Sequence, residues 1–239
     1  MKALILAGGR GNRLDELSEQ HNKCLIKING IHVIEYSLAS AANTDVDEII
    51  IVVGYRAEDI INLYGNAYKG KTIKYVIQHE QRGLVHAIEC AQKAIDGDDF
   101  ILMLADEVLQ NPLHQNMINE FHRSGIFALC GILAVDDKTQ IKKTYTVIKD
   151  GEDQIYRLIE KPRNPLNHFQ GTGDCVFING IYDYVQYTPL HHVRKEKELP
   201  DLIQCAIDDG MMVKAFVICD KYVNINTHDD IKLAESFFK

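Results

Sequence analysis

The stretch ALILAGGRGNR (residues 3–13) joins a short apolar run to a turn that contains three glycines and two arginines. The apolar run, residues 3–7, has the pattern of a strand that is buried on both faces. In open α/β sheets, ligands bind at the carboxyl ends of the strands, and glycines there let backbone N–H groups approach phosphate oxygens. The stretch therefore predicts a parallel α/β sheet with a phosphate site after its first strand.

The glycine turn differs from two common nucleotide loops. It contains no Gly-Lys-Ser/Thr, as a P-loop would, and the third glycine of the dinucleotide fingerprint is missing. An arginine in such a turn suits a triphosphate, because its charge needs direct neutralisation. The alternative is a turn whose glycines serve only the backbone conformation.

The rest of the chain repeats the alternation of strand and helix. Strands are predicted at residues 3–7, 48–53, 73–78, 100–105 and 127–134, and helices at 32–42, 57–65, 84–94 and 114–123. A hairpin follows (144–149 and 154–160), then a breaker segment (160–165), a strand near 176–182, a helix near 199–209, a strand at 213–218 and a helix from 228. This order predicts an α/β fold with a Rossmann-like, mixed but mainly parallel sheet flanked by helices.

We expect a single domain over residues 1–239. Its nucleotide-binding part would cover about residues 1–135, and a small substrate lobe would cover about residues 140–225.

The composition excludes several classes of protein. A net charge of −8 argues against a nucleic-acid surface, and no apolar stretch is long enough to span a membrane. Six cysteines without a Cys-x-x-Cys pair predict free thiols in a reducing compartment. No leader segment is recognisable, so a cytoplasmic protein is expected. Association into a homo-oligomer is left open.

Two motifs carry a family resemblance. LAGGRGNRL (residues 6–14) and NKCLIKINGIHVIEYSL (22–38) resemble the N-terminal signature of the sugar-phosphate nucleotidyltransferases, or nucleotide-sugar pyrophosphorylases. The resemblance implies the nucleotide-diphospho-sugar transferase fold and an enzyme that joins an NTP and a sugar 1-phosphate to give an NDP-sugar and pyrophosphate. It also implies that Arg13 and Lys23 are catalytic groups on the nucleotide phosphates. Asn12 and Asn22 depart from the family pattern without removing a charge.

The same resemblance assigns nucleotide-binding residues. The backbone of the glycine turn would hold the phosphates, through Ala7, Gly8, Gly9 and Gly11. Gln78 and Gly83, at the end of a predicted strand, would flank the base. An amide can both donate to and accept from a pyrimidine edge, so the prediction favours UTP, dTTP or CTP. The alternative for residues 78–87 is a polar loop that caps a helix.

Asp106 follows the apolar run of residues 100–105 and is the predicted ligand of Mg²⁺, the expected cofactor. A carboxylate at the end of a buried strand needs a partner, and Mg²⁺ takes one or two protein oxygens together with substrate phosphates. The resemblance places Asn224 as the second metal ligand and Asp106 among the catalytic residues. Alternatives are a helix-capping role for Asp106 and Glu107 as the ligand. Thr227 is predicted to cap the last helix.

The resemblance also assigns the acceptor site and implies that the small lobe of about residues 140–225 binds the sugar phosphate. Glu160 would hold sugar hydroxyls, and Lys161 would hold the sugar phosphate as a catalytic group. Thr172 and Gly173 are further predicted sugar contacts, and Thr146 stands where many family members have glycine, which would reshape the pocket. The alternative for Glu160-Lys161-Pro162 is a surface turn.

Other functions are left open at this point. They include a guanylyl- or cytidylyltransferase that acts on a heptose, a cyclitol or a non-sugar phosphate, and a non-catalytic subunit that senses nucleotide sugars. A glycosyltransferase is less favoured, because residues 105–107 lack the second aspartate of an Asp-x-Asp motif.

Overall fold

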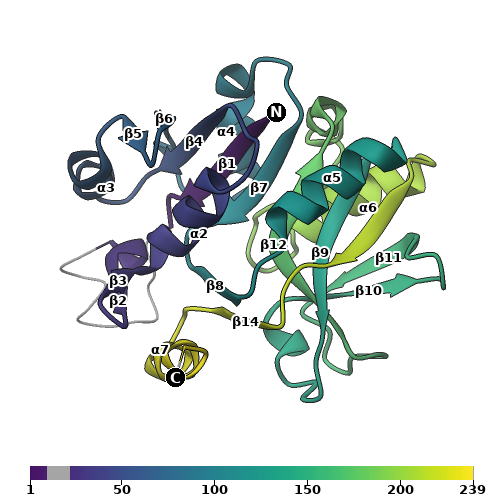
Figure 1. Cartoon of the computed structure of the whole chain (residues 1–239). Coiled ribbons are helices and arrows are strands. Elements are labelled where there is room, and N and C mark those ends of the chain that lie inside the picture. Colours follow the sequence, from purple (N-terminus) through teal and green to yellow (C-terminus); the bar gives the residue numbers. More distant parts are fainter. Residues whose placement is uncertain (10–21, 239) are drawn as a thin grey trace.

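The computed structural model describes residues 1–9 and 22–238 (Figure 1). Its centre is a set of parallel strands in the order β7-β1-β4-β6. These strands are β1 (Lys2–Ala7), β4 (Glu48–Val53), β6 (Lys71–Ile77) and β7 (Phe100–Leu104). Long apolar runs such as EIIIVV in β4 form them because helices cover both faces of the sheet.

The antiparallel strand β12 (Phe169–Phe177) continues the sheet beside β7. It also pairs with β9 (Ala128–Ala134), and β9 pairs in parallel with β13 (Val213–Val217). The outer strands are β5 (Ala67–Tyr68) at one edge and β10 (Tyr145–Lys149) and β11 (Ile155–Glu160) at the other. Because β12 runs opposite to β7, its first half lies at the carboxyl end of β7.

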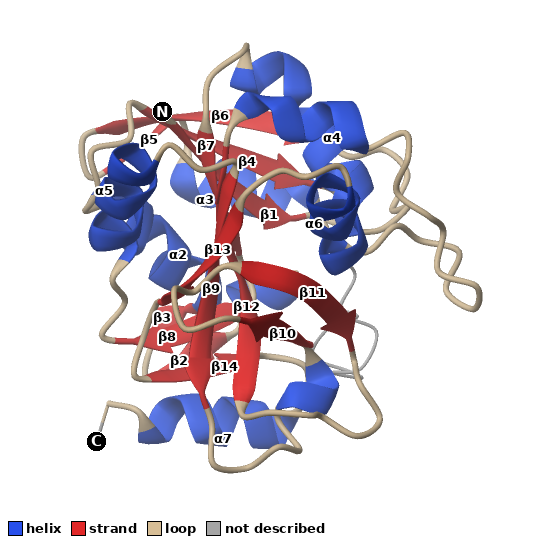
Figure 2. Cartoon of the chain, turned by 90° about the vertical axis from the view of Figure 1, so that its right-hand side faces the viewer, coloured by secondary structure: helices blue, strands red, loops and turns tan. Residues whose placement is uncertain are grey.

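Helices cover both faces of the sheet (Figure 2), and a hydrophobic core lies on each face. One face packs against α4 (Leu84–Ile95) and α6 (Leu199–Asp208). The other face packs against α2 (Val33–Ala42), α3 (Ala57–Tyr64) and α5 (His114–Ser124). In the described residues, no helix is long and apolar enough to cross a membrane.

A third, smaller core joins segments near residues 28–33 and 108 to the C-terminal part of the chain. The strand pairs β8 (Glu107–Gln110) with β14 (Lys221–Asn224), and β2 (Lys27–Ile28) with β3 (Ile31–His32), pack with α7 (His228–Ser236). Thr227 caps α7 in a capping box with Asp230, which confirms the prediction for Thr227. This core holds the segments of Lys23, Asp106 and Asn224 in one region.

The structure confirms the mainly parallel α/β sheet and the main alternating elements predicted before residue 140. The strand predicted near residues 176–182 is wrong. The strand is β12, which begins at Phe169 and ends at Phe177, and a 3₁₀ turn follows over Asn179–Tyr184. Two glycines and an aspartate make FQGTGDCVF a poor strand by propensity, but pairing with β7 and β9 overrides that preference. The division into two parts near residues 135–140 stays a prediction.

Candidate active site

The carboxyl ends of the central strands meet at one edge of the sheet and bring three predicted site residues there. Gly8 follows β1, Gln78 follows β6, and Asp106 comes two residues after β7. Backbone hydrogen bonds hold the ends of these strands in place. The N–H of Gln78 donates to Val53 O at 2.7 Å, and the N–H of Ala105 donates to Leu6 O at 3.1 Å.

A cavity of about 620 Å³ opens at this edge. We call it the nucleotide-side cavity. Its lining includes the predicted residues Ala7, Gly9, Lys23, Gln78, Gly83 and Asp106. Gln81 and Glu196 also line it, although the sequence did not predict them as site residues. Arg13 and Gly11, which the sequence assigns to the phosphates, lie outside the described residues.

A second cavity, of about 310 Å³, lies next to the first, and we call it the acceptor-side cavity. Its lining includes the predicted residues Asp106, Glu160, Lys161, Thr172, Gly173 and Asn224. Asp106, Leu84 and Leu104 line both cavities. The Asp106 carboxylate therefore stands where groups bound in the two cavities would meet.

Lys23 and Asp106 form an ion pair at this junction. The Lys23 ammonium donates to Asp106 Oδ2 at 2.7 Å and to Asn226 Oδ1 at 3.0 Å. The amide of Asn224 donates to Asp106 Oδ1 at 3.4 Å. Lys23 is only 6% exposed, so its charge is balanced here by one carboxylate and one amide oxygen.

Asn22 holds the turn that carries Lys23. Its fully buried side chain accepts the N–H of Cys24 through Oδ1 and donates through Nδ2 to the carbonyl of Tyr55. The first bond caps the short 3₁₀ helix Lys23–Leu25, and the second ties that helix to the loop after β4. Asn22, which departs from the family pattern, therefore fixes the backbone from which Lys23 reaches Asp106.

Asp106 and Asn224 fit a divalent cation only in part. In the described residues, no three His, Cys, Asp or Glu side chains gather in a way that could hold a metal by themselves. One carboxylate and one amide oxygen would suit Mg²⁺, which completes its shell with water and substrate phosphates. The Asn224 oxygen now accepts from Asn226 Nδ2, so the Asn224 amide has to turn before that oxygen could face a cation.

Glu107, which directly follows Asp106 in the chain, is one of the residues that line the acceptor-side cavity. It is 3% exposed, and both of its carboxylate oxygens accept the N–H of Gly173. Tyr222 donates its hydroxyl to Glu107 Oε1 at 2.5 Å. Burial raises the pKa of Glu107, and the nearby Asp174 and Asp106 carboxylates raise it further. Glu107 thus links strands β8 and β14 to strand β12.

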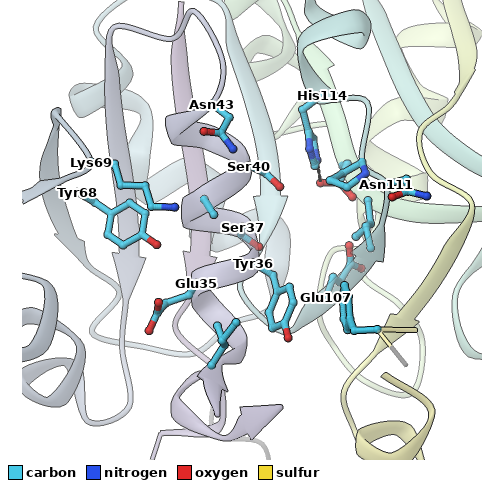
Figure 3. Close-up of a pocket in the computed structure, with 16 residues that line it drawn as sticks. Glu35, Tyr36, Ser37, Ser40, Asn43, Tyr68, Lys69, Glu107, Asn111 and His114 are labelled. Atoms are coloured by element: carbon cyan, nitrogen blue, oxygen red, sulfur yellow. Dashed lines mark hydrogen bonds and ion pairs between the residues drawn. The ribbon is translucent and has the colours of Figure 1, made fainter. Parts of the chain in front are cut away.

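A third cavity, of about 390 Å³, lies on the other side of Glu107, between α2 and the start of α5 (Figure 3). Ser37, Glu107 and His114 are among its lining residues. His114 Nε2 lies 2.9 Å from Asp174 Oδ1, and both side chains are buried. The Glu107 carboxylate therefore belongs to a buried polar wall between this cavity and the acceptor-side cavity.

Gly173 leaves no room for a side chain. A Cβ at this position would lie 2.3 Å from Leu104 Cγ and 3.0 Å from Glu107 Oε1. We expect Gly173→Ala to lower the free energy of unfolding by about 1–3 kcal/mol, because overpacking forces the backbone or a neighbour to move. It should also raise the KM for the acceptor, since Leu104 lines both cavities.

Denaturant unfolding and acceptor kinetics check this expectation. Gly151→Ala is the matched control, because a Cβ there meets nothing within 4 Å, and it should change stability by no more than about 0.5 kcal/mol. Equal unfolding curves for the two variants would contradict the argument.

Three charged residues, Glu160, Lys161 and Glu198, line one part of the acceptor-side cavity. Glu160 Oε1 lies 2.8 Å from Lys161 Nζ and 3.3 Å from an Arg194 nitrogen. Arg194 also pairs with Glu198 at 2.8 Å. Lys161 adopts a left-handed backbone (φ +42°), which is uncommon outside glycine and concentrates at functional sites. Burial, followed by the Glu160 carboxylate, raises the pKa of Glu198.

Arg194, Glu196 and Glu198 were missed in the sequence. The run RKEKE (residues 194–198) has the composition of a solvated loop, so its sequence predicts no role in a site. In the structure, Glu196 lines the nucleotide-side cavity and Glu198 lines the acceptor-side cavity. Arg194, Glu196 and Glu198 occupy every second position directly before α6, and this spacing is the one sequence signal for their role in the cavities.

Thr146 lies away from the acceptor-side cavity. Its side chain is fully buried, and its hydroxyl oxygen lies 2.7 Å from each of two acceptors, Asn167 Oδ1 and Phe169 O, which share its one proton. Thr144 and Tyr145 line the cavity in its place. Successive side chains of a strand point to opposite faces, so the hydroxyl that the sequence placed in the pocket lies on the other face of β10.

The cysteines give the site no nucleophile. All six are free, which confirms the prediction of free thiols. Cys24 lines the nucleotide-side cavity, but burial raises the pKa of its thiol to about 12. The thiol therefore stays neutral near pH 7.

The chain is thus an α/β protein with a mainly parallel sheet and two adjoining cavities, whose shared lining includes the Asp106 carboxylate. Residues 2–237 match the family model for nucleotidyl transferases, and the chain belongs to that family.

Curated relatives agree with this assignment. The chain is 28% identical over 235 residues to the low-salt glycan biosynthesis nucleotidyltransferase Agl11 of Haloferax volcanii, covering 97% of this chain and 64% of the relative. It is 27% identical over 235 residues to the UTP–glucose-1-phosphate uridylyltransferase AglF of the same organism, covering 98% and 95%. It is 28% identical over 221 residues to the glucose-1-phosphate thymidylyltransferase of Streptomyces griseus, covering 91% and 60%.

Solved structures share the fold. A crystal structure of apo UDP-glucose pyrophosphorylase has a TM-score of 0.88 at 16% identity, covering 98% of this chain and 96% of that one. A structure of UDP-glucose pyrophosphorylase with UDP-glucose also has a TM-score of 0.88, at 17% identity, covering 98% and 97%. These likenesses confirm the predicted fold class.

Proposed function

We propose that this chain transfers a nucleotidyl group from a pyrimidine nucleoside triphosphate to a sugar 1-phosphate and releases pyrophosphate. The observation that carries the proposal is the position of Asp106, which lines both cavities and pairs with Lys23. Two anionic substrates can meet only where fixed charges control their approach, and this junction provides such charges. The names of the relatives, a uridylyl- and a thymidylyltransferase, support the same reaction and the pyrimidine base.

The reaction needs positioning more than proton transfer. An oxygen of the sugar 1-phosphate forms a bond to the α-phosphorus of the NTP, and the bond from that phosphorus to the β-phosphate oxygen breaks. The attacking oxygen is already anionic, so no general base is required. Lys23 would hold the triphosphate, together with Arg13 from the glycine turn. Lys161 and Arg194 would hold the acceptor phosphate on the opposite side.

We propose a divalent cation, Mg²⁺, as the cofactor of this reaction. When bound, it would neutralise charge on both substrates and orient them. Asp106 and Asn224 are the residues that would hold it, and Lys23 would then move from Asp106 toward the phosphates. Glu107 would keep the floor of the acceptor-side cavity in place through Gly173.

The test is a screen for pyrophosphate release. The protein is mixed with Mg²⁺, one of UTP, dTTP, CTP, GTP or ATP, and one of a panel of hexose, amino-sugar, heptose, cyclitol and non-sugar phosphates. We expect pyrophosphate and an NDP-sugar with UTP or dTTP and at least one sugar 1-phosphate. Nucleotide binding without product in any mixture would instead support a sensing subunit. Product only with GTP or only with a non-sugar phosphate would replace the proposed substrates.

A further inference from the structure

A short turn, residues 190–197, lies directly before α6 and is closed by its own backbone. Its first and last residues pair as an antiparallel bridge. Inside that bridge, the N–H of His191 donates to Glu196 O at 2.8 Å, and the N–H of Lys195 donates to His191 O at 2.8 Å. These bonds fix the two ends of the turn.

The turn carries one charged side chain toward each cavity. Glu196 lines the nucleotide-side cavity, and its Cβ lies 2.8 Å from the place that a Cβ of Gly83 would take. Arg194 donates to the Glu160 carboxylate at 3.3 Å and pairs with Glu198 at 2.8 Å, and both carboxylates line the acceptor-side cavity. The buried Nε of Arg194 has no hydrogen-bond partner among the described residues, so the protein leaves this donor unused.

The ring of His191 holds the tip of the turn. Its Nδ1 accepts the N–H of Val193 at 3.3 Å and the N–H of Arg194 at 3.2 Å, so the two donors share one lone pair. Within the described part of the chain, no backbone carbonyl accepts either N–H. A backbone N–H can only donate, so the ring has to be neutral with its proton on Nε2. An imidazolium carries a proton on Nδ1 and could accept neither bond.

We propose that His191 is a positioning residue for the acceptor phosphate, because its neutral ring fixes the tip of the turn and thereby the place of Arg194 beside Glu160. When the ring is protonated, the tip loses its acceptor, and the guanidinium is held less firmly. The affinity for the phosphate then falls at acid pH. This inference rests on the proposed function in one respect, since it takes the acceptor phosphate to bind beside Lys161 and Arg194.

The charges that face the ring keep it neutral near pH 7. Desolvation lowers the pKa of His191, and so do the charges of Arg194 and of His192, whose ring stacks on it at 4.7 Å. Asp201 on α6 and Glu160 on β11 oppose this effect but do not cancel it. Because the pKa is lowered in the folded protein, the contribution of the ring is complete above the ordinary value of about 6.5 and is lost as the pH falls through the folded-state pKa.

Three variants separate the acceptor on the ring from a mere filling of space. His191→Ala removes the acceptor. His191→Asn restores one that does not titrate, because an asparagine oxygen accepts the backbone N–H two residues further on. His192→Asn is the matched control, since it removes an exposed imidazole from the same turn and leaves the ring of His191 in place. His191 belongs to none of the three hydrophobic cores, so its variants should fold.

The measurement is the dissociation constant of inorganic phosphate for the full chain at about pH 7.5, without nucleotide or Mg²⁺. It is followed by NMR at the backbone amides of Glu160 and Lys161. We expect this constant to rise about fivefold to tenfold in His191→Ala, the effect of one positioned hydrogen bond, and to stay within about twofold of wild type in His191→Asn and His192→Asn. In steady-state assays, the KM for the sugar 1-phosphate should rise in His191→Ala by a similar factor, and kcat should change less.

A pH series tests the neutral ring itself. Between about pH 7.5 and about pH 5, the dissociation constant should rise several-fold more in the wild-type protein than in His191→Asn. The Asn variant supplies the baseline, because phosphate groups also titrate in this range.

Four results would overturn the inference. They are the same phosphate affinity in the wild-type protein and His191→Ala, an equal loss in His191→Ala and His191→Asn, parallel pH profiles of the wild-type protein and His191→Asn, and Glu160 and Lys161 amides that do not respond to phosphate. The proposed function fails separately. If no mixture releases pyrophosphate but the phosphate titrations behave as expected, the inference about His191 stands. If pyrophosphate is released and the variants bind phosphate alike, only the inference falls.

Discussion

Asp106→Asn is expected to lower kcat by about a hundredfold or more, the loss associated with one preorganised charged group at a reacting centre. The substitution keeps the size of the side chain but removes the charge that pairs with Lys23 at 2.7 Å and that would hold a cation. Asp106 is the only predicted catalytic residue among the described residues that lines both cavities. Its loss should therefore affect the transfer step rather than the binding of either substrate alone.

Steady-state pyrophosphate release checks this expectation, with circular dichroism to show that the variant folds. Asp136→Asn is the control, because Asp136 is an exposed aspartate outside both cavities. Turnover of Asp106→Asn close to that of the control would remove Asp106 from the catalytic centre. A raised requirement for Mg²⁺ in the variant would support its role as a metal ligand.

Lys23→Ala is expected to lower kcat by a similar factor, about a hundredfold. The Lys23 ammonium is buried at the junction and is held by Asp106 and Asn226, so no exposed lysine can replace it. Without it, the triphosphate loses a direct counter-charge and Asp106 faces the substrates unpaired. We expect the KM for the NTP to rise as well, because the charge acts on the bound nucleotide.

Lys27→Ala is the matched control, since Lys27 lies four residues further along and is exposed. It removes the same charge from the same part of the chain and should leave kcat and the KM for the NTP near their wild-type values. If Lys23→Ala and Lys27→Ala behave alike, the ion pair with Asp106 has only a structural role.

The residues at the strand ends could be predicted well from the sequence, because that prediction needs only local patterns. An apolar run ending in glycines or in an aspartate marks the carboxyl end of a buried strand, and parallel strands place such ends at one edge. This rule by itself brings Gly8, Gln78 and Asp106 to one region of the molecule. The alternation of helices and strands is equally readable, since its hydrophobic periods are local.

Strand β12 could not be placed correctly from local sequence patterns. Its glycines weaken the strand pattern, yet Gly173 is needed because Leu104 occupies the space of a side chain. The pairing partners of β12 lie about 45 and 75 residues earlier in the chain, in β9 and β7. Such a strand is formed by its neighbours, and its own residues carry too little of the signal.

Local periodicity and the motif around residues 6–14 were thus sufficient for the fold class and for the family of the chain. Only the packed chain shows that Asn22 fixes the turn of Lys23, that Glu107 supports Gly173, and that Arg194 comes to Glu160. The physical reason is distance along the sequence. A strand or helix is dictated by residues within a few positions of one another. Polar groups such as Arg194 and Glu160, or the Gly173 N–H and Glu107, are more than 30 positions apart and meet only after the layers have packed.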